Sequence, residues 1–421
     1  MTSEKLFENV TLNYIGMDKF KSNYLSVSFV LPFEKRSAAM NTLIMKVLKR
    51  GTLSYPDMTA LSKKLEYLYS GDIFTKATSF GETQVLSFSM DVLNNRFATD
   101  GTDILLETLK LLGEVIFSPL TENGVFKNSY FESEKRNQLD DISAEINSKG
   151  KYALTRACEN MFANERYRFS ALGDIETVSA FTNEEVYAHY LWVLKNASVN
   201  ITFVGDTDRK NLKNALVEMF LGRAPIGSLD CKTEVIRSVS EPKTVIEECV
   251  GNQGNLVMGF RSGKVLSDGD YPKMALFSEL YGGAPSSKLF MNVREKMSLC
   301  YYCASVPEAV KGILFVRAGI ENKNFETARD AILEQLALLC QGKFTEEELA
   351  NAKLSLINGY KEISDNPTSL QNWYIGRMLS GIVQSPDEAI EVVKNITKEE
   401  IVATAKNVVL DTVYFLRGVA K

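Results

Sequence analysis

Histidine is almost absent from this sequence of 421 residues, which contains only His189. Ser-His-Asp and Cys-His catalysis both need a histidine base, so only this residue can provide one. A metal site that takes two histidines from one chain is excluded by the same count. His189 lies in the aromatic-rich amphipathic stretch NEEVYAHYLWVL. We interpret it as a residue of a helix surface or core edge.

Several other features are missing. The net charge is −5, which argues against nucleic acid as the main partner because phosphate binding needs a basic surface. No run approaches the roughly 18 apolar residues that a membrane-spanning helix needs, and the first residues, MTSEKLFENV, lack the apolar core of a secretion signal. The cysteines are scattered rather than arranged as a disulfide framework, at positions 158, 231, 249, 300, 303 and 340. We therefore expect a cytoplasmic protein without a membrane or nucleic-acid partner.

Two segments near the ends of the two halves have the same pattern. They read FTNEEVYAHYLWVLKNASVNITFVGD and ITKEEIVATAKNVVLDTVYFLRGVA. Each begins with a threonine N-cap and acidic residues in the first helical turn, which predicts a helix. A short β-branched and aromatic strand then ends at Gly205 or Gly418. A pattern that recurs over such a distance indicates an internal duplication.

The starts of the halves also correspond. The strand-like NYLSVSFVLPF precedes an expected helix at 37–49, and GNLVMGFRSGK precedes one at 270–281. The order strand, helix, helix, strand, strand, helices, strand follows in each half. This order predicts an α+β fold with two homologous domains, each with helices packed on one mostly antiparallel sheet. We assign 1–222 to the first domain, 223–243 to a linker and 244–421 to the second domain.

The stretch YGGAPSSKLFMNVREKMSLCYYCAS carries a family resemblance. It is similar to the pitrilysin/insulinase family of zinc peptidases, of the mitochondrial-processing-peptidase-like type with the LuxS/insulinase metallohydrolase-like fold. In that family, paired subunits or halves close around a peptide. Arg294 and Tyr301 match the arginine and tyrosine that bind the peptide beside the zinc of the opposite domain. The alternative is that Arg294 makes a surface ion pair and Tyr301 packs in a strand.

The zinc motif of the family is missing. Members carry His-x-x-Glu-His before a glycine-threonine turn, and here those positions are Thr42 to Lys46, with Met45 in place of the glutamate. The resemblance places the third zinc ligand at Asp141, with Glu134 matching a second family carboxylate. Thr42 and Met45 are poor zinc ligands, and Lys46 adds a positive charge. We predict no metal in this chain.

Lys46 suggests what replaces the metal. If the fold is kept, its ammonium lies near Asp141 and forms a charge-assisted contact with that carboxylate. The alternative is that Lys46 extends to solvent while its apolar neighbours pack inward.

The CYYC stretch at Cys300–Cys303 has CxxC spacing. It lies in a strand-like run, where residues three apart point to opposite faces. We therefore expect the thiols to diverge and predict neither redox nor metal chemistry.

These features resemble those of bacterial family members that divide the work between two proteins. The sequence looks most like a subgroup from Gram-positive bacteria associated with elongation-factor-P modification. We predict a non-catalytic subunit that binds peptide and completes the site of a zinc-bearing homologue, with zinc only in that partner. The chain pairs as such a heterodimer or as a homodimer. The alternatives are a structural or peptide-binding protein with no role in proteolysis, and an active peptidase with an unorthodox metal site.

Overall fold

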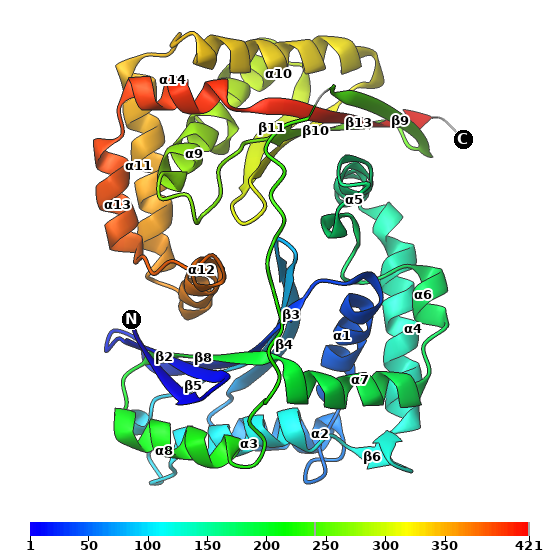
Figure 1. Ribbon diagram of the computed structural model, residues 1–421, viewed down its shortest axis with the longest axis vertical. Coiled ribbons are helices and arrows are strands. Elements are labelled where there is room, and N and C mark those ends of the chain that lie inside the picture. The colour runs from blue at the N-terminus through cyan, green and yellow to red at the C-terminus, as the bar shows by residue number, and fades with distance from the viewer. Residues whose placement is uncertain (240, 420–421) are drawn as a thin grey trace. The chain divides into compact units, whose positions relative to one another are not determined.

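The computed structural model of the protein describes residues 1–239 and 241–419 (Figure 1). Residue 240, inside the predicted linker, and residues 420–421, at the end of the predicted second domain, lie outside the described part. The chain forms two compact units. Unit 1 comprises Met1–Ala144 and Phe169–Lys232, and unit 2 comprises Glu145–Arg168 and Thr233–Lys421.

Unit 1 is built on a six-stranded sheet in the order β1-β2-β8-β3-β5-β4. Its strands are β1 (Thr2–Phe7), β2 (Val10–Gly16), β3 (Ser22–Pro32), β4 (Asp72–Phe80), β5 (Thr83–Leu93) and β8 (Ser198–Gly205), beside a small hairpin of β6 (Thr121–Glu122) and β7 (Val125–Phe126). Its helices are α1 (Lys35–Leu48), α2 (Met58–Tyr67), α3 (Ile104–Phe117), α4 (Asn128–Ala144), α6 (Ile175–Ser179), α7 (Asn183–Asn196) and α8 (Arg209–Phe220).

The sequence determines this arrangement through the alternation of apolar and polar residues in the strands and through the N-cap residues of the helices. In β3, residues such as Leu25, Val27 and Phe29 alternate with serines, and this apolar face joins one core with α1, α3, α7 and α8. Helix α7 begins as predicted, with the Thr182 side chain accepting a hydrogen bond from the backbone N–H of Glu185. Figure 1 shows α3, α7 and α8 along one side of this sheet.

Unit 2 has a five-stranded sheet in the order β11-β12-β10-β13-β9. Its strands are β9 (Lys243–Val250), β10 (Gly254–Arg261), β11 (Cys300–Glu308), β12 (Ile313–Ile320) and β13 (Val409–Val419). Its helices are α5 (Lys149–Met161), α9 (Tyr271–Ser278), α10 (Phe325–Cys340), α11 (Glu346–Ile363), α12 (Pro367–Leu379), α13 (Pro386–Asn395) and α14 (Lys398–Lys406), with π-helical segments η4 (Glu279–Gly283) and η5 (Leu289–Lys296).

The two sheets have the same topology. Across the unit 1 sheet, five neighbouring strands have the order β2-β8-β3-β5-β4. The equivalent order across the unit 2 sheet is β9-β13-β10-β12-β11. In each sheet one pair is parallel, β2 with β8 and β9 with β13, and the other pairs among these strands are antiparallel. The predicted α+β fold with two equivalent, mostly antiparallel domains is confirmed.

The segment 145–168 belongs to a different unit from the one that the predicted domain ranges give it. We had assigned 145–168 to the first domain, but it belongs to unit 2. Figure 1 shows α5 on the side of the unit 2 sheet opposite α10 and α14. There Ala153, Ala157 and Met161 pack on β10, β12 and β13. The physical reason is that this sheet face is apolar and α5 covers it.

Buried charges also attach this segment to unit 2. Arg261 is 2% exposed and donates hydrogen bonds to Glu165, the shorter at 2.7 Å, and to Asp411 at 2.8 Å. Lys311, also fully buried, lies 2.7 Å from Glu165. Burial alone raises the pKa of Glu165, but its hydrogen bonds with Arg261 and Lys311 outweigh that effect and lower the pKa. The segment is therefore held by charge as well as by apolar packing.

Among the described helices, none combines the length and the apolar character required to cross a membrane.

Candidate functional site

The predicted remnant of the zinc motif lies where α1 packs against α4 in unit 1. Lys46 lies in the last turn of α1 and Arg50 lies two residues beyond its end, while Glu134 and Asp141 are two helical turns apart on α4. The Nζ atom of Lys46 lies 2.5 Å from Oδ2 of Asp141. The predicted Lys46–Asp141 contact is confirmed.

A second ion pair beside it was not predicted. Nη1 of Arg50 lies 2.5 Å from Oε1 of Glu134, and the guanidinium also lies over the Tyr130 ring. The Glu134 side chain is 10% exposed, whereas that of Asp141 is 56% exposed. The carboxylate that most needs a counter-charge is therefore Glu134. The available sequence signal was the four-residue spacing of Lys46 and Arg50, which is the spacing of neighbours on a helical face, although Arg50 lies two residues beyond the end of α1.

The donor atoms at the motif positions do not fit zinc. The Thr42 hydroxyl donates to the Ala171 carbonyl at 2.6 Å, and Met45 is buried in the apolar core. Lys46 carries a positive charge at the third position. Within residues 1–239 and 241–419, no group of three or more His, Cys, Asp or Glu side chains is arranged to hold a metal ion. The predicted motif positions on α1 therefore lack the ligands that zinc requires.

Arg294 lies in η5, the π-helical segment before β11 in unit 2. Its Nε atom forms a surface ion pair with Oε1 of Glu295 at 3.6 Å, as the alternative interpretation expected, and its guanidinium stacks over the Phe290 ring at 4.5 Å. The Arg294 side chain is 39% exposed. This position leaves the guanidinium donors accessible. Short π-helical segments are found frequently at functional sites.

Tyr301 is directed outward by two local irregularities. Ser298 has a left-handed backbone, with φ of 52°, and turns the chain from η5 into β11. In the pairing of β11 with β12, Cys300 is opposite Ile320 and Tyr302 is opposite Gly319, so Tyr301 is the extra residue of a β-bulge. Bulges re-aim side chains beside functional sites. Tyr301 is 63% exposed as a result.

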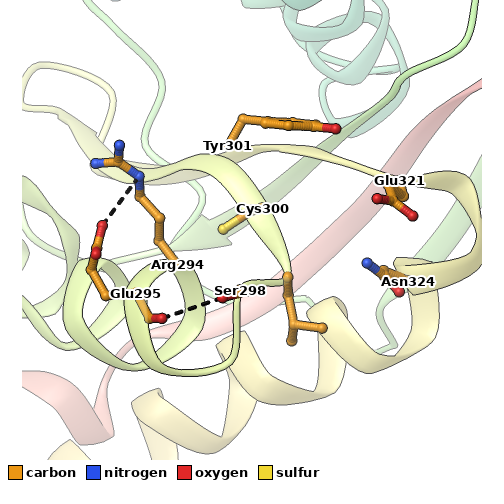
Figure 2. Close-up of a pocket in the computed structure, with 8 residues that line it drawn as sticks. Arg294, Glu295, Ser298, Cys300, Tyr301, Glu321 and Asn324 are labelled. Atoms are coloured by element: carbon orange, nitrogen blue, oxygen red, sulfur yellow. Dashed lines mark hydrogen bonds and ion pairs between the residues drawn. The ribbon is translucent and has the colours of Figure 1, made fainter.

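Arg294 and Tyr301 contribute to one pocket of about 340 Å³. Figure 2 shows Arg294 projecting from the helical segment and Tyr301 from the strand that follows it, with Cys300 between them. The structure thus brings together the two residues that the family resemblance selected. The pocket is lined by Arg294, Glu295, Ser298, Leu299, Cys300, Tyr301, Glu321 and Asn324.

The expectation that the CYYC thiols diverge is wrong. The bulge at Tyr301 shifts the alternation by one residue, so Cys300 and Cys303 share a face of β11. Both contact the helix-side core of unit 2, Cys303 within it at 4% exposure and Cys300 at its margin. A hydrogen bond between the thiols lowers the pKa of Cys300, and the Arg294 charge lowers it further. The error came from reading β11 as a regular strand.

His189 is a structural residue, as predicted. Its ring stacks on Trp192, with centroids 5.5 Å apart, and its Nε2 lies 2.9 Å from Oδ1 of Asn41. The Asn41 amide group donates to Gln84, so its oxygen accepts from the imidazole. Burial lowers the pKa of His189 to about 4. The imidazole is therefore neutral at physiological pH.

Comparison with known proteins identifies the family. A model of the peptidase M16 inactive domain matches residues 180–356. The probable inactive metalloprotease YmfF of Bacillus subtilis strain 168 is 33% identical over 415 residues, which cover 97% of this chain and 96% of that protein. The chain belongs to the peptidase M16 family. The family predicted from the sequence, and its inactive type, are confirmed.

Solved structures agree with this M16 assignment. A conserved protein from Enterococcus faecalis V583 superposes with a TM-score of 0.91 at 26% identity, over 100% of this chain and 99% of that one. A peptidase M16 inactive domain from Pseudomonas fluorescens superposes at 0.82 over the same shares, with 18% identity, and shows the common fold alone. The protein is thus an inactive M16-family member.

Proposed function

We propose that this M16 protein is the non-catalytic subunit of a two-protein zinc metallopeptidase. It binds the peptide substrate and completes the active site of a homologous partner that carries His-x-x-Glu-His. The metal and the general base belong to the partner alone. The subunits function in the cytoplasm, a location that the six free cysteines favour.

The observation that carries this proposal is the shared pocket of Arg294 and Tyr301. The donor groups of these side chains suit a peptide: a guanidinium and a phenol hydroxyl can both donate to a carbonyl oxygen. The same donors stabilise negative charge that develops on that oxygen during hydrolysis. The inactive motif on α1, which lacks zinc ligands, points to a site completed by another protein.

The position of β11 supports peptide binding further. This strand begins at the pocket and forms one edge of the unit 2 sheet, so its outer backbone groups face no neighbouring strand in that sheet. An extended peptide can pair with such an edge through main-chain hydrogen bonds while side-chain donors hold its scissile group. Tyr301 and Arg294 then lie at the end of the peptide-binding edge.

The test is reconstitution with the zinc-bearing homologue from the same genome. We expect the two chains to co-purify, and peptide hydrolysis to require both, since each lacks part of the site. Hydrolysis by the homologue alone at the rate of the mixture would overturn the shared site. A stable complex that binds no peptide and cleaves none would instead indicate a structural role.

A further inference from the structure

Arg377 is a buried cation without an anion beside it. It lies in the last turn of α12 in unit 2 (Figure 1) and is 7% exposed. Within residues 1–239 and 241–419, its guanidinium forms no hydrogen bond and no ion pair, and its Nε atom is buried without a partner. We propose that Arg377 and the tyrosines around it form a binding site for a carboxylate group.

Arg261 shows what the fold supplies to another buried arginine. It is 2% exposed and donates hydrogen bonds to the carboxylates of Glu165 and Asp411. A buried charge is costly unless it is paired and hydrogen-bonded, and a guanidinium carries five N–H donors. Arg377 has the same requirement, so we infer that its anion comes from a ligand.

The one printed contact of the Arg377 guanidinium among the described residues is with Trp373, one helical turn earlier. Its Cζ atom lies 3.1 Å from the centroid of that ring. The indole is held in place because its Nε1 donates to the Gln384 carbonyl at 2.7 Å. A cation–π contact offsets part of the charge, but an indole ring supplies no oxygen acceptor for the N–H donors. These donors therefore suit an additional oxygen ligand.

Two buried tyrosines add hydroxyl donors to the site. The Tyr360 ring meets Trp373 edge to face, with centroids 5.0 Å apart, and Tyr374 is three residues before Arg377, which makes them neighbours on the helix surface. In the described part of the chain, neither hydroxyl forms a hydrogen bond. Burial raises the pKa of Tyr360 to about 12 and also raises that of Tyr374, while the Arg377 charge opposes both shifts. Both phenols are therefore protonated at pH 7 and can donate to a carboxylate.

The acidic side chains that most affect these tyrosines have other partners. Glu279 accepts a hydrogen bond from the Ser355 hydroxyl at 2.6 Å. Glu388 accepts one from the backbone N–H of Ser385 at 2.7 Å and completes the capping box of α13. Each carboxylate thus has a role away from the Arg377 guanidinium.

Charge balance selects the class of anion. Burial lowers the pKa of Arg377 to about 10, so the side chain keeps its single positive charge at pH 7. A carboxylate neutralises that charge, and its two oxygens match the guanidinium fork. A phosphate group approaches two negative charges near neutral pH and would leave an excess charge in a buried site, where neutral phenols cannot balance it. The carboxylate can belong to a free small acid or to the end of a peptide.

The experiment uses the full chain with Trp192→Phe, which leaves Trp373 as the fluorescent reporter because the sequence contains two tryptophans. We expect sodium acetate, compared with sodium chloride at equal ionic strength, to change Trp373 emission saturably and to raise the melting temperature. Arg377→Met should weaken acetate binding at least about 30-fold. Tyr374→Phe should weaken it about tenfold. Arg329→Met, which removes a partly exposed cation paired with Asp330, should leave binding unchanged.

Two further ligands distinguish the sources of the carboxylate. Binding of acetylglycylglycine as well as acetate, without binding of its amide, would assign the site to peptide ends. Binding of acetate alone would assign it to a free small acid.

The absence of a saturable acetate response would overturn the proposal, as would an equal response in folded Arg377→Met and Tyr374→Phe. Tighter binding of phosphate than of acetate at pH 8 would overturn the choice of a carboxylate. Because neither a partner subunit nor a peptidase substrate is present, these outcomes are independent of the proposed function.

Discussion

The ammonium of Lys46, on α1, lies 2.5 Å from a carboxylate oxygen of Asp141, on α4, where these two helices of unit 1 pack against each other. Arg50, two residues beyond the end of α1, and Glu134 on α4 form a second ion pair. The interface of α1 and α4 therefore keeps its carboxylates and balances them with side-chain cations.

The two ion pairs should differ in their contribution to stability. Lys46→Met should change the free energy of unfolding by less than about 1 kcal/mol, because Asp141 is 56% exposed and water replaces the lost partner. Arg50→Met should destabilise unit 1 by about 3 kcal/mol, since it leaves Glu134 nearly buried without its cation. Urea unfolding of both variants measures the difference. Adding Glu134→Gln to Arg50→Met should recover part of the loss, and equal losses in the single variants would contradict this account.

The purified chain should contain far less than one zinc ion per molecule after exposure to zinc and buffer exchange. The reason is the donor set: a threonine engaged with the Ala171 carbonyl, a buried methionine and a lysine cannot ligate zinc. Elemental analysis measures the content. Stoichiometric zinc would restore the interpretation of an active peptidase with an unusual metal site.

His189 should make stability depend on pH in a defined window. Its pKa is about 4 in the folded chain, compared with an ordinary value of 6.5, because burial disfavours the charged imidazole. As pH falls, His189 is therefore protonated in the unfolded chain before it is protonated in the folded chain. The contribution of the neutral imidazole to the free energy of unfolding is complete above pH 6.5 and is lost as pH falls toward 4. Over that interval the difference in unfolding free energy between the protein and His189→Gln should shrink by about 3 kcal/mol.

Denaturant unfolding at several pH values from 7 to 4 provides this measurement. Other acidic groups titrate in both proteins and cancel in the difference. His189→Phe, which keeps a ring against Trp192, should behave like His189→Gln. A difference that stays constant across the pH range would show that His189 is accessible in the folded chain.

The buried charges around Arg261 should hold segment 145–168 to unit 2. Arg261→Met leaves Asp411 buried without its cation and Glu165 with Lys311 alone, so we expect a loss of about 3–5 kcal/mol. The matched surface change Arg36→Met removes an exposed pair with Glu185 and should cost less than about 1 kcal/mol. Calorimetry and limited proteolysis measure both variants. Similar melting temperatures, with no new cleavage in 145–168, would refute this role.

The sequence was sufficient for the architecture because repeated hydrophobic patterns and caps are local signals. Thr182 and Thr397, chosen as N-caps from the sequence, accept the expected hydrogen bonds. The Lys46–Asp141 contact was also predictable, since the family resemblance gave the fold that brings α1 and α4 together. Arg294 and Tyr301 came from the family resemblance, which lies within one continuous stretch of the sequence.

The features that the sequence did not predict depend on irregular or non-local structure. A bulge is invisible in CYYC, and that one extra residue reverses the relationship of Cys300 and Cys303. Segment 145–168 has an ordinary helical sequence, and its apolar contacts and the buried partners of Glu165, which reveal where it packs, are distant in the sequence. Glu134 required the same three-dimensional information, because its low exposure cannot be read from its neighbours.

The central claim is that Arg294 and Tyr301 complete a partner's peptidase site, and the kcat/KM of the reconstituted pair tests it most directly. Arg294→Ala and Tyr301→Phe should each lower kcat/KM by about 100-fold, the typical effect of removing an oxyanion donor, with the complex still assembled by size-exclusion chromatography. The matched changes Arg329→Ala, at a partly exposed position, and Tyr67→Phe, at an exposed one, lie outside the pocket lining and should leave activity unchanged. Full activity of the assembled complex with both Arg294→Ala and Tyr301→Phe would contradict the account.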